Sequence, residues 1–190
     1  IRILGLCRTS PAKTAAPAEP AADPSLGIYS TIEEAIAAAK QTFPKFCALP
    51  LDTRNRIIAE IRKTMLANAT ALAKAAHEET GLGRFEDKIQ KNRLVAEKTP
   101  GTEDLQPVAF TGDHGLTLCE PAPFGVIGAI TPCTNPTSTI ICNAIGMLAA
   151  GNVVVFNTHP TAKSCSMQTV ALLNKTITAA GGPPNAVTCV

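Results

Sequence analysis

Tryptophan is absent from this chain, and aromatic residues together make up only 4% of it. Few rings are therefore available to stack on bases, and a formal net charge of +2 gives no basis for binding nucleic acid. No apolar run reaches about 18 residues, the length that a membrane-spanning helix requires. With 190 residues, of which 45% are hydrophobic, the sequence predicts a globular protein with one large domain or two small ones.

Paired cysteine motifs are missing as well. The seven cysteines are scattered, form no Cys-x-x-Cys pair, and have no histidine at metal-ligand spacing. An odd number without pairing argues against a disulfide framework or a zinc site. The cysteines fit a reducing, cytosolic compartment better than an oxidising compartment in which disulfides form.

Carboxylates disappear from the last third of the chain. From Pro121 to Val190 there is no Asp or Glu, and Lys163 and Lys175 are the permanent charges. This segment therefore offers no carboxylate as general base, metal ligand or ribose-binding group. One interpretation is that its helix N-termini are left open to an anion. The other is that a well-buried sheet layer has no room for charges, and the two are compatible.

The common phosphate-binding motifs do not occur either. The chain has no Gly-x-Gly-x-x-Gly and no Gly-x-x-x-x-Gly-Lys-Ser/Thr. A conventional Rossmann fingerprint and a P-loop are therefore excluded. A dinucleotide that binds this chain has to bind in another way.

Residues 1–25 predict a flexible tail, because four prolines and many alanines follow a short apolar start. Residues 26–105 predict helices. Ser30-Thr31-Ile32-Glu33 matches a capping box that begins the first helix at Ser30, and Pro44 is expected to end it.

A second helix is expected to open near Asp52 or Thr53. Its buried stripe consists of Ile57, Ile58, Ile61 and Met65. The helical pattern resumes after a possible break near 68–70 and reaches a glycine cap at Gly81. A charged helix then covers about Arg84 to Lys98.

Residues 106–121 change to a period of two, which predicts a β-hairpin with a longer loop, 111–115. His114 lies in that loop, where a solvent-exposed turn residue is favoured over a catalytic one. Residues 122–190 alternate strand, helix, strand, helix and strand. This order predicts an α/β fold with half of a parallel, Rossmann-like sheet.

The loop after the first predicted parallel strand, Thr131 to Pro136, falls at the carboxyl end of that strand, where such sheets bind ligands. Pro136 suits the first helical position, and Asn135 before it is a preferred helix cap. Spacing alone favours this capping role. The alternative is that Thr134 and Asn135 donate hydrogen bonds to an oxyanion or to a cofactor phosphate.

Two further residues compete for roles at the same edge. His159-Pro160 follows the second parallel strand, again with proline at an expected first helical position. His159 is either a capping or packing residue or a group at the mouth of the crevice. Cys133 lies near two helix N-termini that could lower a thiol pKa, which makes it a conceivable nucleophile. No His, Asp or Glu is near it in sequence, which argues against that role.

Several motifs, taken in order, resemble the aldehyde dehydrogenase superfamily, and most closely its CoA-acylating branch, the propionaldehyde and acetaldehyde dehydrogenases of bacterial microcompartments. The resemblance covers about Gly27 to Val190. The motifs that carry it are Gly27-Ile28-Tyr29, Glu79-Thr80-Gly81-Leu82-Gly83, Glu86-Asp87-Lys88 with Lys91-Asn92, Thr99-Pro100-Gly101, Leu105, Thr111-Gly112-Asp113, Pro123-Phe124-Gly125-Val126-Ile127-Gly128, Thr131-Pro132 with Thr134-Asn135-Pro136, Leu148-Ala149-Ala150-Gly151-Asn152, and His159-Pro160.

This resemblance implies a reaction: a cysteine thiolate attacks an aldehyde, hydride passes to NAD, and coenzyme A releases the acyl group from the thioester. It implies Asn135 and Thr134 as catalytic candidates. The implied cofactor-binding candidates are Ile130, Thr131, Pro132, Thr134, Asn135, His159 and Pro160.

The resemblance also implies organisation and partners. The hairpin corresponds to a subunit-pairing element, so a homo-oligomer is expected. Residues 1–25 resemble the remnant of a shell-targeting segment, which would bring the protein to shell or core proteins of a microcompartment in the bacterial cytoplasm. Residues 122–190 correspond to the first half of the domain that binds NAD and coenzyme A.

The chain departs from the family pattern at several places. The family's nucleophilic cysteine lies beyond Val190, so these 190 residues alone are expected to be inactive. Cys133 stands where relatives often carry serine. The segment 157–161 lacks a basic residue that relatives often have, which weakens the case for a phosphate contact there. The rival hypothesis is a non-catalytic nucleotide-binding or assembly module that keeps half of the fold.

Overall fold

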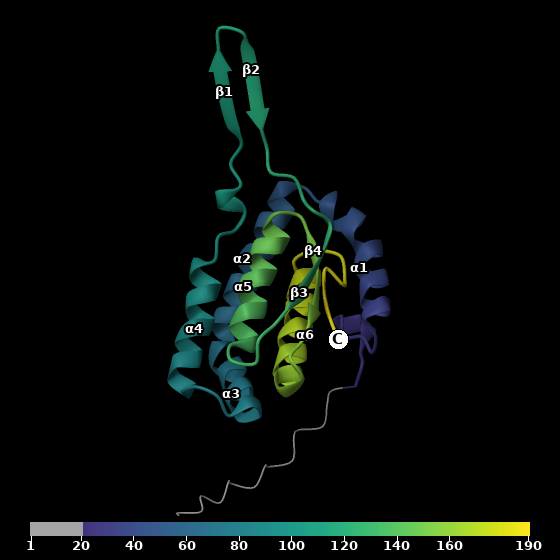
Figure 1. Cartoon of the computed structure of the whole chain (residues 1–190), viewed down its shortest axis with the longest axis vertical. Helices are drawn as coiled ribbons and strands as arrows, with labels where there is room; N and C mark the ends of the chain where they lie inside the picture. The colour runs from purple at the N-terminus through teal and green to yellow at the C-terminus, as the bar shows by residue number, and fades with distance from the viewer. Residues whose placement is uncertain (1–20) are drawn as a thin grey trace, which may run out of the picture.

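The computed structural model describes residues 21–190, which are arranged in layers (Figure 1). A parallel sheet lies between helix α1 on one face and helices α5 and α6 on the other, and α2, α3 and α4 form an outer layer against α5 and α6. The helices are α1 (Ile32–Cys47), α2 (Leu51–Ala67), α3 (Ala69–Thr80), α4 (Phe85–Lys98), α5 (Pro136–Ala149) and α6 (Lys163–Ala179). The strands are β1 (Val108–Gly112), β2 (Gly115–Cys119), β3 (Val126–Ile130), β4 (Val153–Asn157) and β5 (Val187–Cys189). The expected α/β fold is confirmed.

Apolar runs form the sheet. The order is β3-β4-β5, all parallel, and the first four residues of the central strand β4 are buried. A central parallel strand is covered on both faces, so it needs a continuous apolar run instead of alternation. Ile28 adds a short parallel bridge to Cys189, which brings the N-terminal segment to the edge of the sheet. Only residues 1–20 of the expected tail lie outside the described part, and Pro24–Leu26 form a short 3-10 helix.

The main core lies between the sheet, α5, α6 and α2. The predicted stripe of Ile57, Ile58, Ile61 and Met65 on α2 is confirmed, because each of these side chains is at most 2% exposed. It packs in one cluster with apolar residues of the sheet and of the two helices that cover it. The outer helices and the sheet layer therefore share one hydrophobic core.

Two predictions about the first helix are wrong. The cap is Thr31 and not Ser30, since the Thr31 hydroxyl accepts the backbone N–H of Glu34 at 3.3 Å. Pro44 does not end α1, which continues to Cys47. The last turn is retained because Phe46 is fully buried, and the Pro44 carbonyl still accepts the N–H of Ala48.

The hairpin of β1 and β2 stands away from the rest of the molecule (Figure 1). All ten of its strand residues are exposed. The expected longer loop is wrong: Gly112 pairs with Gly115, so only Asp113 and His114 turn the chain. His114 is exposed, in agreement with the favoured interpretation.

Within residues 21–190, no helix combines the length and apolar character needed to cross a membrane. In the same part of the chain, no group of three or more His, Cys, Asp or Glu side chains is arranged to hold a metal ion. The described cysteines, from Cys47 to Cys189, are all free thiols.

Candidate functional site

Two turns meet at the carboxyl edge of the sheet. Strand β3 leads through 131–135 into α5, and β4 leads through 158–162 into α6. Ile130 pairs with Asn157, and the N–H of Thr131 donates to the Asn157 carbonyl at 3.1 Å. The two sequence-predicted segments therefore start side by side, as the parallel order requires.

The cofactor candidates on the first turn differ in exposure. Ile130 is 85% exposed although it is a large apolar residue, and Pro132 is exposed beside it. Thr131 is 2% exposed, and its hydroxyl has no hydrogen-bond partner within the described residues. An exposed apolar side chain beside a buried hydroxyl without a hydrogen-bond partner is typical of a surface that contacts a ligand or another part of the protein.

Asn135 does not have the role that spacing favoured. Pro136 takes the first position of α5 as predicted, but the Asn135 side chain caps no backbone N–H, so the predicted side-chain cap is wrong. Its Oδ1 instead accepts a hydrogen bond from Lys91 Nζ at 3.0 Å. Because an ammonium group only donates, the oxygen has to face Lys91, and the amide nitrogen is turned away from it.

Thr134 is held by a second lysine of α4. Lys88 Nζ donates to the Thr134 carbonyl at 3.0 Å, and Lys88 is only 6% exposed. Burial lowers the pKa of this ammonium group, since its charged form is desolvated. Sequence reasoning gave neither lysine a role, although both stand in motifs that carried the family resemblance.

A buried asparagine fixes α4 against the start of α5. Asn92 is 1% exposed, and its Oδ1 accepts from the Thr137 hydroxyl at 3.0 Å. Its Nδ2 donates to the Ala69 carbonyl at 3.1 Å, so the same side chain also binds α3. The lysines therefore project from a helix that is anchored beside the turn they hold.

His159 is a cap, one of the two roles considered for it. Its Nδ1 accepts the backbone N–H of Thr161 at 3.2 Å. Accepting from a backbone donor requires an unprotonated Nδ1, so the neutral ring carries its proton on Nε2. Pro160 takes a first helical position as expected, in a 3-10 helix, Pro160–Ala162, that leads into α6 at Lys163.

The N-terminus of α6 is not left open to an anion. The Glu79 carboxylate, from α3, accepts the N–H groups of Ser164 at 2.8 Å and Cys165 at 2.7 Å. The interpretation that helix N-termini of the segment 121–190 are left open to an anion is therefore wrong for α6, because a carboxylate from outside that segment takes these N–H groups. Cys133 packs partly buried against the cluster of Ala76, Ala162 and Cys165. Burial is the main cause that raises the pKa of the Cys165 thiol well above its usual range.

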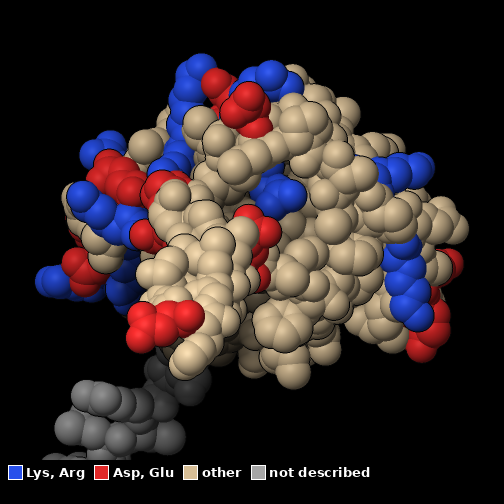
Figure 2. Space-filling model, turned by 90° about the horizontal axis from the view of Figure 1, so that it is seen from above, with Lys and Arg blue, Asp and Glu red and all other residues tan. Residues whose placement is uncertain are grey.

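A groove of about 370 Å³ runs from Asn135 between α4 and α5. Its walls include Leu94 and Val95 from α4, and Thr139 and Asn143 from α5. Seen from above, charged side chains gather mainly toward the edges of the molecule, a few stand near the centre of the view, and uncharged residues cover the area between them (Figure 2).

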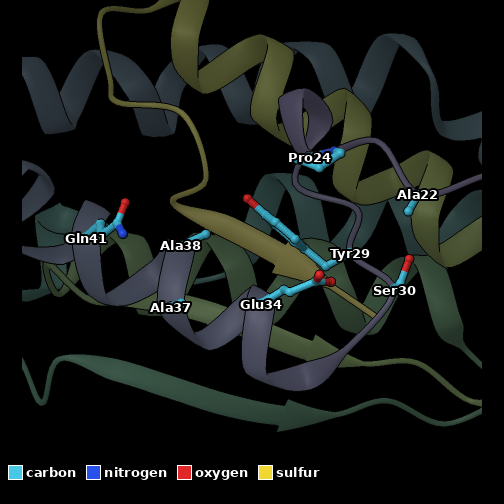
Figure 3. A pocket seen from close by; sticks show the side chains of 8 residues that line it. All are labelled: Ala22, Pro24, Tyr29, Ser30, Glu34, Ala37, Ala38 and Gln41. Carbon is cyan, nitrogen blue, oxygen red and sulfur yellow. The ribbon is translucent and has the colours of Figure 1, made fainter.

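A separate hollow of about 400 Å³ lies between α1 and the N-terminal segment (Figure 3). Tyr29 and Glu34 line it, and burial, followed by the charge of Glu34, raises the pKa of the Tyr29 hydroxyl. None of the candidate site residues lines this hollow. The hollow is therefore separate from the two turns that carry the candidate residues.

Comparison with known proteins identifies the family of the chain. The sequence model described as "Aldehyde dehydrogenase family" matches residues 8–190. Acetaldehyde dehydrogenase (acetylating) of Bilophila wadsworthia is 51% identical over 164 residues, which is 86% of this chain and 34% of that protein. The chain thus spans about a third of the length of this curated relative.

Three solved structures share the fold. A propionaldehyde dehydrogenase from the fucose utilisation microcompartment of Clostridium phytofermentans is 53% identical, with a TM-score of 0.84 over 86% of this chain and 38% of that one. The Rhodopseudomonas palustris propionaldehyde dehydrogenase, with bound CoA and an acylated cysteine, is 49% identical, with a TM-score of 0.85 over 87% and 38%. An engineered glycolyl-CoA reductase with bound NADP+ is 48% identical, with a TM-score of 0.85 over 89% and 39%.

These matches confirm the resemblance to the CoA-acylating dehydrogenases that the sequence motifs indicated. The chain belongs to the aldehyde dehydrogenase family.

Proposed function

We propose that this chain is the part of a CoA-acylating aldehyde dehydrogenase that carries one wall of the active site. The overall reaction converts an aldehyde, NAD and coenzyme A into an acyl-CoA and NADH. A cysteine thiolate adds to the aldehyde carbonyl, hydride leaves for NAD, and coenzyme A takes the acyl group from the thioester. The nucleophilic cysteine is supplied by a segment outside these 190 residues.

The observation that carries the proposal is the orientation of Asn135. Its oxygen is occupied by Lys91 at 3.0 Å, and one N–H of its Nδ2 donates to the Thr134 hydroxyl at 3.5 Å, which leaves the other N–H to donate. When the thiolate adds to the carbonyl, the carbonyl oxygen gains negative charge. A fixed amide donor at that oxygen stabilises the transition state more than the ground state.

Thr134 contributes through its backbone position. Lys88 holds the Thr134 carbonyl, which fixes the peptide that leads into Asn135. The hydroxyl of Thr134 lies 3.5 Å from Asn135 Nδ2 and is exposed, so it can share the donation to an incoming group. Positioning of this kind reduces the entropy that the reacting groups lose.

The cofactor candidates fit a nucleotide in part. NAD supplies the hydride acceptor when it is bound. The exposed face of Ile130 with Pro132 offers an apolar contact for a ring, and the buried Thr131 hydroxyl lacks a partner. Glu79 already occupies two N–H groups at the start of α6, so a phosphate cannot use those two donors. His159 stands with Pro160 beside that helix end, and the Nε2–H of His159 is available as another donor.

The test of this function is product formation. Propionaldehyde, NAD and coenzyme A are mixed with the natural protein that carries this segment, and propionyl-CoA is identified by mass spectrometry alongside NADH absorbance. We expect both products in equal amounts, and NADH that forms equally fast without coenzyme A would contradict the acylating assignment. The 190-residue chain by itself is expected to form neither product.

A non-catalytic assembly module is the rival, and the intact mass of the natural protein separates the two. A mass near 19.7 kDa favours the module, whereas a mass more than twice as large favours the enzyme.

The exposed hairpin supports a homo-oligomer as part of the proposal. Phe110 is 61% exposed and Leu116 is 69% exposed, with Val108 and Leu118 at 50% and 59%. Apolar side chains on both faces of a protruding hairpin suit a second copy of the chain. Light scattering coupled to gel filtration should give a multiple of the chain mass, and a monomer at all concentrations would refute this part.

Location inside a bacterial microcompartment is proposed from the similarity to a dehydrogenase of such a compartment. Residues 1–20 would carry the contact with shell or core proteins, and they lie outside the described residues. A fluorescent protein fused to residues 1–25 should co-purify with shells, and a diffuse distribution would count against this assignment.

A further inference from the structure

Lys91 and Asn135 meet across two helices. They are 44 positions apart, and the contact joins α4 to the residue that precedes α5. Lys91 is exposed apart from this contact, and the bond length of 3.0 Å is ordinary for a charged donor. The contact is not part of the apolar core, so packing of the core does not explain it.

The position of Asn135 before α5 offers its Oδ1 a second set of partners. Its backbone has φ of −137° and ψ of 56°, and it stands directly before Pro136 at the start of a helix. An asparagine at this position ordinarily turns its Oδ1 to the N–H groups of the first helical turn. Lys91 competes with those N–H groups for the same oxygen, and in this structure the oxygen accepts its hydrogen bond from Lys91.

The placement of the lysines opposes the usual helix electrostatics. The N-terminus of α5 carries partial positive charge, and cations near it are unfavourable. Nevertheless both Lys88 and Lys91 direct their ammonium groups to the residues immediately before this helix. The neighbouring carboxylate of Asp87 is paired with Arg84 at 2.8 Å, so it does not take Lys91 away from Asn135. A local rule that is broken in this way is expected at functional positions.

We infer that Lys91 is a positioning residue for the reaction, acting through Asn135. The inference rests on the proposed function. Lys91 selects the side-chain orientation in which Asn135 Nδ2 donates to the carbonyl oxygen of the aldehyde. The positive charge at Oδ1 also polarises the amide and strengthens its N–H donors. Lys91 itself touches neither the aldehyde nor the cofactor.

The kinetic experiment uses the natural protein with Lys91→Met, Asn135→Ala and the double substitution. We expect Lys91→Met to lower kcat roughly tenfold with KM for the aldehyde unchanged, because the donor is displaced from a site where its complete loss costs about 10²-fold or more. In the Asn135→Ala background, Lys91→Met should have no further effect, since its target is gone. Lys91→Arg, which keeps a cationic donor, should restore most of kcat.

Lys98→Met is the matched control. Lys98 lies in the last turn of the same helix and is exposed, so the substitution removes the same charge from α4 without touching Asn135. It should leave kcat unchanged. If Lys98→Met lowered kcat as much as Lys91→Met does, the inference would be overturned. It would also be overturned if Lys91→Met lowered kcat by the same factor in the Asn135→Ala background as in the unmutated protein.

A second readout does not depend on turnover. In the natural protein labelled with nitrogen-15, the side-chain amide signals of Asn135 report its orientation and its donor to Oδ1. Lys91→Met should shift these signals, and Lys98→Met should not. If the unmutated protein forms no propionyl-CoA, the proposed function fails, while unchanged Asn135 signals in Lys91→Met would overturn the inference separately.

Discussion

The outer helices α2 to α4 are rich in charge, whereas the α/β unit from Pro121 to Val190 contains no carboxylate at all. The structure connects these two facts. Charged side chains from the outer helices reach the ends of α5 and α6 and satisfy backbone groups there. The α/β unit has no carboxylate of its own at these ends, and the carboxylate at the start of α6 comes from another layer of the fold.

Three of these contacts follow the helix dipole. Arg54 donates to the Ala149 carbonyl at the end of α5, and Arg56 donates to the Ala180 carbonyl at the end of α6. Glu79 accepts at the start of α6. Cations at C-termini and an anion at an N-terminus stabilise both helices. The start of α5, where two lysines of α4 stand, departs from this pattern, and it coincides with the candidate active site.

The largest expected effect tests whether the two regions share one core. Ile61→Ala on α2 should lower the free energy of unfolding by about 2–5 kcal/mol, because Ile61 is fully buried. Urea unfolding followed by circular dichroism measures it. Leu94→Ala on α4, 57% exposed, is the control and should change stability by less than about 1 kcal/mol. If Ile61→Ala lowered the free energy of unfolding by less than about 1 kcal/mol, the two regions would not share one core.

The next effect concerns the anion at the start of α6. Glu79→Ala leaves two N–H groups without their acceptor, so we expect it to lower the free energy of unfolding by about 2 kcal/mol. Thermal unfolding compares it with Glu78→Ala, whose exposed carboxylate has only a 3.8 Å contact with Lys74. Equal stability of the two variants would mean that water replaces Glu79 without loss.

A smaller effect is expected at the end of α6. Arg56→Met keeps much of the aliphatic side chain and removes the donor to Ala180, so we expect a loss of about 0.5–1 kcal/mol. The comparison is Arg93→Met, an exposed arginine of α4. Raising the salt concentration should narrow the difference between these two variants, since a dipole interaction is screened. A difference that grows with salt would contradict the dipole account.

The smallest effect on the free energy of unfolding is expected in the hairpin. Phe110→Ser alters a side chain that is 61% exposed, so stability of the monomer should change by less than about 0.5 kcal/mol. Chemical unfolding at low protein concentration measures this. A loss comparable to that of Ile61→Ala would mean that the hairpin packs on the body of the protein in solution.

Local patterns predicted much of the fold. The stripe on α2, the apolar runs of β3 and β4, and Gly81 as a left-handed cap follow from periodicity and glycine chemistry. Pro44 and the hairpin turn were predicted wrongly, since burial of Phe46 and the pairing of Gly112 with Gly115 depend on tertiary contacts.

The site was predicted only in part. Motifs pointed to Thr134 and Asn135, but their partners Lys88 and Lys91 are more than 40 positions away. Spacing therefore assigned Asn135 to the nearest backbone N–H groups, as a cap. Glu79 was missed for the same reason, because 85 positions separate it from Ser164. Contacts between layers decide the role of a polar residue, and one segment read by itself does not contain them.

Native-state hydrogen exchange tests most directly whether the outer helices and the α/β unit are one structure. The probes are the amide of Ile61 in α2 and the amide of Val154 in β4, which donates to Ala186. If the two regions unfold together, both amides open with the same free energy, within about 0.5 kcal/mol. An Ile61 amide that opens several kcal/mol below Val154 would show that α2 unfolds alone and would contradict the account.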